Sequence, residues 1–106
     1  MDLKHYIHRL PDKVSPEHLE GVNSTFHFDV SGEGGGQYSI IAKDGELHIE
    51  DGLVGEADCK VSGKSKNVMA ILQKKMHPLK AIMFGKVKIQ NQAELMRWAK
   101  LLGMIK

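Results

Sequence analysis

Alternating apolar and polar residues predict four strands in the first half of the chain. Phe26, Phe28 and Val30 alternate with polar neighbours, a spacing typical of a strand with one buried face. Turn-forming segments at 31–36 and 44–45 separate this strand from two others with the same period. The expected strands cover 26–30, 38–42, 47–49 and 57–61. We expect them to follow one another as a meander.

Apolar residues spaced by three and four positions predict helices on both sides of these strands. The N-terminal stripe runs from Leu3 to Leu10, where Pro11 should end the helix. Ser65 should cap the helix that follows the fourth strand, and Pro78 should begin another. The expected helices cover 3–10, 16–21, 65–76, 79–84 and 92–105, with a fifth strand at 86–89. This order of elements predicts an α+β fold.

The composition is that of a folded globular protein. Its 106 residues suffice for one domain, expected to span 1–106, and 42% of them are hydrophobic. No apolar run reaches the ~18 residues of a membrane span, and the N-terminus lacks the pattern of a signal peptide. A single cysteine cannot form an internal disulfide. We therefore exclude a secreted disulfide scaffold and a membrane protein, and expect a cytoplasmic location.

Charge is divided unevenly between the two halves of the chain. Residues 1–59 carry four Lys/Arg against twelve Asp/Glu, and residues 60–106 carry eleven against one. Either the halves interleave and their charges neutralise across the surface, or the lysines form a basic face suited to anionic headgroups. We favour the first interpretation, because halves of a sequence seldom become separate faces of a small domain. The face would comprise Lys64, Lys66, Lys74, Lys75, Lys80, Lys86 and Lys88. Nucleic acid is not an expected partner, since no recognition motif accompanies these lysines.

Candidate catalytic and metal-binding residues are few. The glycine-rich segment 31–36 lies between two strands and is expected to be a hairpin turn, not a phosphate-binding loop. His5 and His8 share a helix face but have no third ligand nearby in sequence. Cys59 on a strand should be a small buried residue, and Asp58 beside it would raise its pKa. The sequence therefore predicts no enzyme, no metal site and no cofactor.

Methionines are spread through the helices that follow the strands. Met69, Met76 and Met83 have flexible, polarisable side chains that fill irregular space or line a pocket for apolar guests. Periodicity does not separate a filled core from a hollow one.

Ordered motifs from about Phe26 to Leu102 resemble the sterol carrier protein type-two (SCP-2) family. They are Phe26-x-Phe28-x-Val30-Ser31-Gly32, Asp44-Gly45, Ala57-Asp58-Cys59-Lys60-Val61 and the run from Pro78 to Ile89. The chain departs from the family at three places. Gln73-Lys74 and Asn91 stand where glycines are common, and Asn67 replaces a usual acid. Asparagine at 91 can adopt the left-handed conformation that a glycine would supply.

The resemblance implies a five-stranded, mostly antiparallel sheet covered by helices, with an apolar tunnel between them. It also implies a non-enzymatic carrier of sterols, fatty acids, acyl-CoA or similar lipids. The sheet floor would be Phe26, Phe28, Tyr38 and Ile40, and the helical roof Leu72, Met76, Ile82, Met83, Trp98 and Leu102. The C-terminal helix is expected to move, and the lysines could contact an anionic membrane. The alternative is a closed tunnel in an interaction module, which dimerises or serves a catalytic partner protein.

Overall fold

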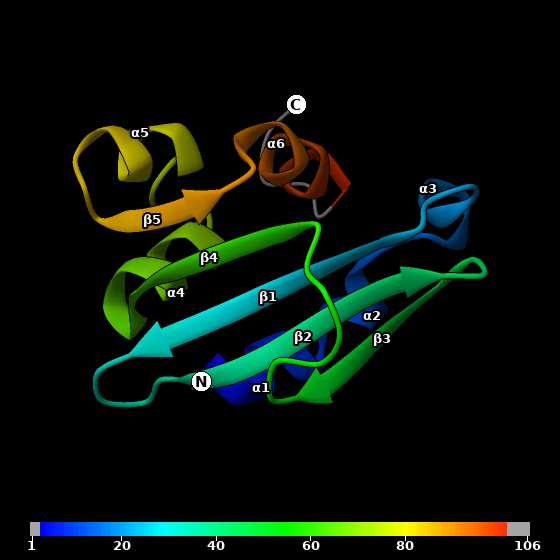
Figure 1. Cartoon of the computed structure of the whole chain (residues 1–106), viewed down its shortest axis with the longest axis horizontal. Coiled ribbons are helices and arrows are strands. Elements are labelled where there is room, and N and C mark those ends of the chain that lie inside the picture. Colours follow the sequence, from blue (N-terminus) through cyan, green and yellow to red (C-terminus); the bar gives the residue numbers. More distant parts are fainter. Residues whose placement is uncertain (1–2, 102–106) are drawn as a thin grey trace.

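Five strands form one sheet, and six helices accompany it in the computed structural model, which describes residues 3–101 (Figure 1). The strands are β1 (Ser24–Ser31), β2 (Gly36–Lys43), β3 (Glu46–Asp51), β4 (Cys59–Lys64) and β5 (Val87–Gln90). The helices are α1 (Leu3–His8), α2 (Leu10–Lys13), α3 (Pro16–Leu19), α4 (Ser65–Leu72), α5 (Pro78–Met83) and α6 (Gln92–Leu101). The predicted α+β class is confirmed.

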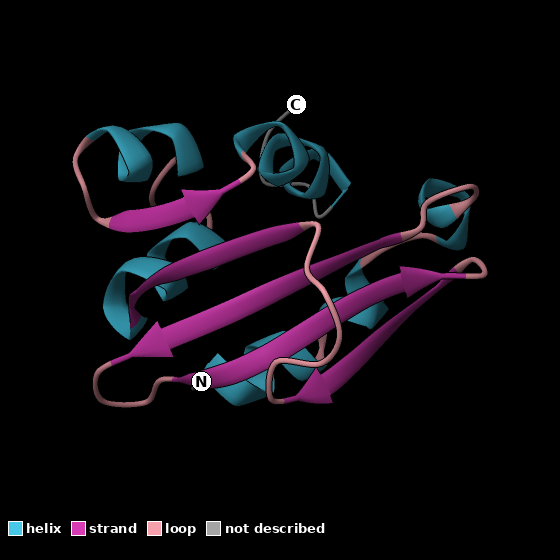
Figure 2. Cartoon of the chain, viewed as in Figure 1, coloured by secondary structure: helices cyan, strands magenta, loops and turns pink. Residues whose placement is uncertain are grey.

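The strand order is β3-β2-β1-β4-β5, in which β1 and β4 are parallel and the other neighbours antiparallel. The sheet is therefore mostly antiparallel, as expected. The meander is wrong at the fourth strand, because β4 pairs with β1 and not with β3. To reach β4, the chain leaves one edge of the sheet and passes over β2 and β1 (Figure 2).

This crossing segment, residues 52–58, is fastened to the sheet by buried polar side chains and is called the strap below. The Ser39 hydroxyl donates to the Gly52 carbonyl over 2.7 Å and accepts from the Val54 amide over 2.8 Å. His27 donates through Nε2 to the Val54 carbonyl over 2.8 Å. Because Ser39 and His27 are buried and satisfied in this way, they stabilise the crossing without the cost of unpaired polar groups.

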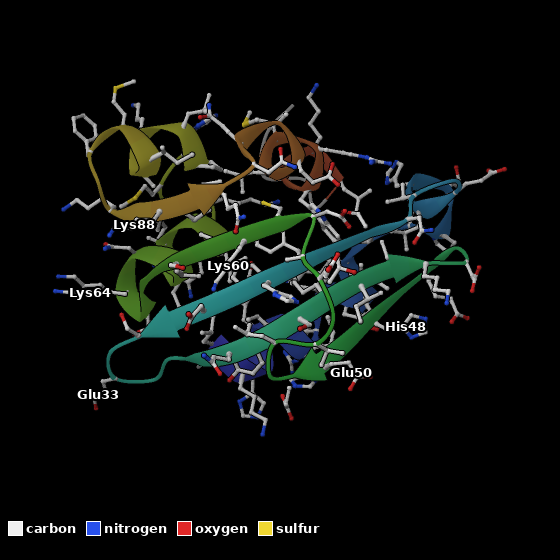
Figure 3. All side chains as sticks on the ribbon, viewed as in Figure 1. Glu33, His48, Glu50, Lys60, Lys64 and Lys88 are labelled. Carbon is white, nitrogen blue, oxygen red and sulfur yellow. The ribbon has the colours of Figure 1, made fainter. Side chains whose placement is uncertain are left out.

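Strand register sorts the side chains onto two unlike faces. Phe26 lies opposite Ile40 and Cys59, and Phe28 lies opposite Tyr38 and Val61, so these residues share one face. That face is buried in the core, whereas polar side chains of the intervening positions occupy the other face. Figure 3 labels Lys60, His48 and Glu50, which the register places on that second face.

Several helix boundaries differ from those predicted. Pro11 does not end the N-terminal helix, because a separate α2 begins at Leu10 with the proline in its first turn. Ser65 is not the cap of α4, since Lys64 holds that position and the serine hydroxyl donates to the Glu33 carbonyl. Helix α4 ends at Leu72, earlier than expected.

Lys74 explains the early end of α4. It adopts a φ of 64°, and the amides of Lys74 and Lys75 donate back to the carbonyls of Ile71 and Ala70. This is the helix-ending geometry that glycine usually provides. Asn91 also has a positive φ of 70°, which confirms the expectation for that position.

Replacing Lys74 with glycine should raise the free energy of unfolding by about 0.5–1 kcal/mol. The left-handed conformation costs a non-glycine residue about 1–2 kcal/mol, partly offset by the greater chain entropy of glycine when unfolded. Urea unfolding measures the difference. Gln73→Gly is the matched control. Gln73 has a φ of −85°, which needs no glycine, so this variant should be less stable than the wild type. Equal effects of the two substitutions would contradict the assignment.

Candidate functional site

A wholly apolar cavity lies between the sheet and the helices α4, α5 and α6. Its volume is about 30 Å³. The strand residues that line it are Phe26, Phe28, Ile40, Val61, Val87 and Ile89, and the helical ones are Val68, Ile71, Leu72, Pro78, Leu95, Trp98 and Ala99. No polar side chain is among them, so the cavity suits an apolar guest and offers no group for catalysis.

Aromatic rings form part of the cavity wall at β1 and α6. The Phe26 and Phe28 ring centroids are 4.7 Å apart, and the Trp98 ring meets Phe26 edge-on with centroids 5.6 Å apart. These distances lie in the favourable range for aromatic pairs. Strand alternation places the two phenylalanines, and the helical stripe of α6 places the tryptophan.

A polar network connects the roof helix α6 to β1. Trp98 donates through Nε1 to the Ser24 hydroxyl over 3.0 Å, and that hydroxyl donates to Glu94 Oε2 over 2.6 Å. Arg97 approaches the other Glu94 oxygen at 3.5 Å. At the start of α6, Asn91 Oδ1 accepts from the Glu94 amide and Asn91 Nδ2 donates to the Asp58 carbonyl of the strap. The network therefore sets the position of the indole above the cavity.

Half of the predicted floor and roof residues line this cavity. These five are Phe26, Phe28, Ile40, Leu72 and Trp98. Tyr38 is buried on the same face but lies outside the lining, next to the edge of the His8 ring. Met76 and Ile82 are half-buried against the core and do not line the cavity.

Met83 is wrongly placed by the prediction, and Leu102 lies outside the described residues. Met83 is 76% exposed at the end of α5, because the helix turns its Ala81 side into the core. It therefore forms no part of the roof.

Eight lining residues were missed by the predicted site. They are Val61, Val68, Ile71, Pro78, Val87, Ile89, Leu95 and Ala99. Their apolar stripes were visible in the sequence as strand alternation and helical spacing. What the stripes did not show is which buried residues border empty space.

The cavity differs from the expected tunnel in size. A volume of about 30 Å³ admits a few water molecules at most, so no lipid chain fits without movement of the walls. The structure shows a small cavity at the place where the tunnel was expected.

Cys59, a potential nucleophile near the cavity, is unreactive. Burial raises the pKa of the Cys59 thiol to about 12, with smaller contributions from the charges of Glu94 and Asp58. Such a thiol remains protonated at neutral pH and is a poor nucleophile. Within residues 3–101 there is no group of three His, Cys, Asp or Glu side chains that could hold a metal.

Known proteins share this architecture, an α+β domain whose helices cover an apolar cavity. Residues 3–102 match the SCP-2 sterol transfer family, and the chain belongs to that family. A search of curated proteins finds no match.

Solved structures with the same fold come from carriers and from a larger enzyme. The sterol carrier protein domain 2 of Helicoverpa armigera is 24% identical, with a TM-score of 0.74 over 94% of this chain and 84% of that one. Palmitated SCP2L2 from Aedes aegypti is 22% identical, with a TM-score of 0.72 over 97% and 93% of the two chains. The sec-alkylsulfatase Pisa1 from Pseudomonas sp. is 17% identical, with a TM-score of 0.75. This chain is covered over 92% of its length in that match but spans only 15% of the sulfatase.

None of the helices between residues 3 and 101 has the length and apolar character that crossing a bilayer requires.

Proposed function

We propose that this domain binds and transfers an apolar lipid in the cavity beneath α4, α5 and α6, without catalysing a reaction. The observation that carries the proposal is the lining, which is apolar on every wall and includes strand and helix residues alike. Membership of the SCP-2 sterol transfer family supports the same function.

The bound form would be an opened state of this structure. Removing a methylene group from water contributes about 0.8 kcal/mol, so ten methylenes contribute about 8 kcal/mol before ordering costs. That free energy can offset the separation of roof from floor, where a small cavity already interrupts the packing. We propose that α6 moves, because the sheet would have to lose backbone hydrogen bonds to open.

A fatty acyl chain, as a fatty acid or an acyl-CoA, is the first candidate ligand, with a sterol as the second. The lining holds no polar group to satisfy a buried headgroup, which favours a chain that leaves its headgroup at the surface. The palmitated state of the Aedes aegypti relative also supports an acyl chain.

The second candidate is an interaction module whose cavity stays closed. The small cavity volume favours it, and so does the presence of the same fold within the much longer alkylsulfatase chain. Such a module would form a homodimer or serve a catalytic partner protein. Trp98 is buried within the domain and is not available to such an interface.

For either function we propose a reducing compartment such as the cytoplasm, since the single Cys59 has no disulfide partner within the chain.

Native mass spectrometry of freshly purified protein tests the proposal. We expect a discrete adduct above the denatured mass, which after release is identified as a fatty acid, an acyl-CoA or a sterol. A protein that stays bare after incubation with these lipids, and melts at an unchanged temperature, would contradict lipid binding. The interaction module would then be favoured.

A further inference from the structure

The turn between α5 and β5 presents two large apolar side chains to solvent. Met83 is 76% exposed and Phe84 is 70% exposed, and they are the most exposed large hydrophobic residues of the described chain. The turn is well defined, because the Gly85 amide donates to the Ile82 carbonyl and the Lys86 amide donates to the Ala81 carbonyl. Gly85 has the positive φ of 70° that this helix ending requires. Single exposed apolar residues are ordinary, but two adjacent ones on an ordered turn suggest a contact surface.

Lysines surround this turn. A surface groove of about 490 Å³ is lined by Lys64, Lys66, Lys86 and Lys88 together with Phe84. Its other lining residues are uncharged. None of the four lysines pairs with an acidic side chain among the described residues. Figure 3 shows Lys64 and Lys88 on neighbouring elements at one end of the molecule, with Glu33 of the β1–β2 turn as the nearest labelled acid. Four of the seven lysines considered for a basic face therefore line one groove.

The opposite end of the molecule carries a mostly acidic groove. It is lined by Glu17, Glu20 and Asp44, with Lys43 as its single basic residue. Figure 1 places α3 and the β2–β3 turn, which supply these residues, far from the α5–β5 turn. A domain with opposite charges at its two ends is oriented by an anionic surface, and its basic end faces that surface.

The basic groove also touches the wall of the apolar cavity. Val87 lines both, so the groove and the cavity adjoin at this residue. Opposite Val87 lies Gly63, where an added Cβ would approach the valine Cγ1 to 2.9 Å. Asn67 of α4 donates through Nδ2 to the Lys86 carbonyl, which holds the first turn of α4 against this site.

We propose that the Met83–Phe84 turn and its four lysines dock the domain on an anionic lipid bilayer, with the Val87 wall of the cavity facing the headgroups. The proposal rests on the proposed function, because a carrier must meet a membrane to take up or release its lipid. A soluble phosphate would bind the lysines but would make no contact with the exposed phenyl ring. A bilayer can bind the lysines through its headgroups and the ring through its acyl chains. The lysines supply attraction to anionic lipids, and Phe84 inserts at the boundary of headgroups and acyl chains.

Vesicle sedimentation of the full chain tests the proposal. We expect binding to vesicles of phosphatidylcholine mixed with phosphatidylglycerol, weak binding to phosphatidylcholine alone, and loss of binding at high salt. The double variant Lys64→Gln/Lys86→Gln should bind the mixed vesicles about 25-fold more weakly, at about fivefold for each lysine. Phe84→Ala should weaken binding about tenfold. The matched controls are Lys43→Gln at the acidic end and Val54→Ala, an exposed apolar residue of the strap, and both should bind as wild type.

Equal weakening in the controls, or unchanged binding in both groove variants, would overturn the docking surface. Fatty-acid binding in vesicle-free solution is measured in parallel through the fluorescence of Trp98, the single tryptophan. A wild-type protein that binds the fatty acid in solution but does not dock on the mixed vesicles would refute this surface alone. Docking without any solution binding would refute the proposed function alone.

Discussion

Replacing Trp98 with alanine should lower the free energy of unfolding by about 3–5 kcal/mol, the range found for large buried aromatic residues. The indole is 2% exposed, packs edge-on against Phe26 and donates its only N–H to Ser24. Alanine would lose these contacts and enlarge the cavity that the ring borders. Denaturant unfolding followed by circular dichroism measures the loss, since the variant has no tryptophan to report it.

Trp98→Phe is the control for the aromatic part of this effect. Phenylalanine keeps a ring beside Phe26 and loses the hydrogen bond to Ser24, which should cost about 0.5–1.5 kcal/mol beyond the smaller ring volume. If alanine were no more destabilising than phenylalanine, the indole would not be the structural centre of the roof. Saturating lipid should restore more stability to the alanine variant than to the wild type, because the ligand fills the larger space.

Ala99→Phe should weaken lipid binding at least tenfold while leaving the fold intact. Ala99 is 3% exposed and faces the cavity from α6, so a phenyl ring there occupies the space that an acyl chain needs. Overpacking of this kind costs about 1–3 kcal/mol of stability. Titration of palmitate against Trp98 fluorescence measures the affinity, and circular dichroism verifies the fold.

Ala93→Phe provides the same substitution on the outer side of the same helix. Ala93 is exposed, and this variant should bind palmitate as the wild type does. Ala99→Val adds less volume and should give an intermediate affinity, which keeps the comparison informative if the larger residue disturbs folding. A folded Ala99→Phe variant with wild-type affinity would show that the lipid binds elsewhere.

Alternation in the sequence was sufficient to predict which strand residues share the buried face, and the family resemblance assigned them to the floor. Phe26, Phe28 and Ile40 were assigned to the inner face by period alone, and the register confirms that they share it. The helical stripe of α6 likewise placed Trp98. These assignments succeed because the burial of one face is recorded residue by residue in the sequence.

The crossing of the strap could not be predicted in this way. Ser39 and His27 occupy outward positions of their strands, where polar residues are ordinary, and only the folded chain shows that residues 52–58 cover them. A turn at Asp51-Gly52 is consistent with either a hairpin or a crossover. Pairing between β1 and β4 depends on side-chain contacts distant in sequence, so local pattern does not reveal it.

Met83 illustrates the limit for the candidate site. Helix α5 has only six residues, too few for the sequence to define which of its faces is buried. A methionine near its end is therefore compatible with either the buried or the exposed face. The structure turns Ala81 inward and leaves Met83 and Phe84 outside. Empty volume is harder still to predict, because the same apolar residues can line a cavity or close it.

The position of lipid relative to Trp98 tests the central claim most directly. A fatty acid brominated along its chain quenches tryptophan fluorescence on contact, whereas the unbrominated acid does not. With lipid in the cavity beneath α4, α5 and α6, we expect saturable quenching at one acid per protein and its loss in Ala99→Phe. Binding of the brominated acid without quenching of Trp98 would contradict the account.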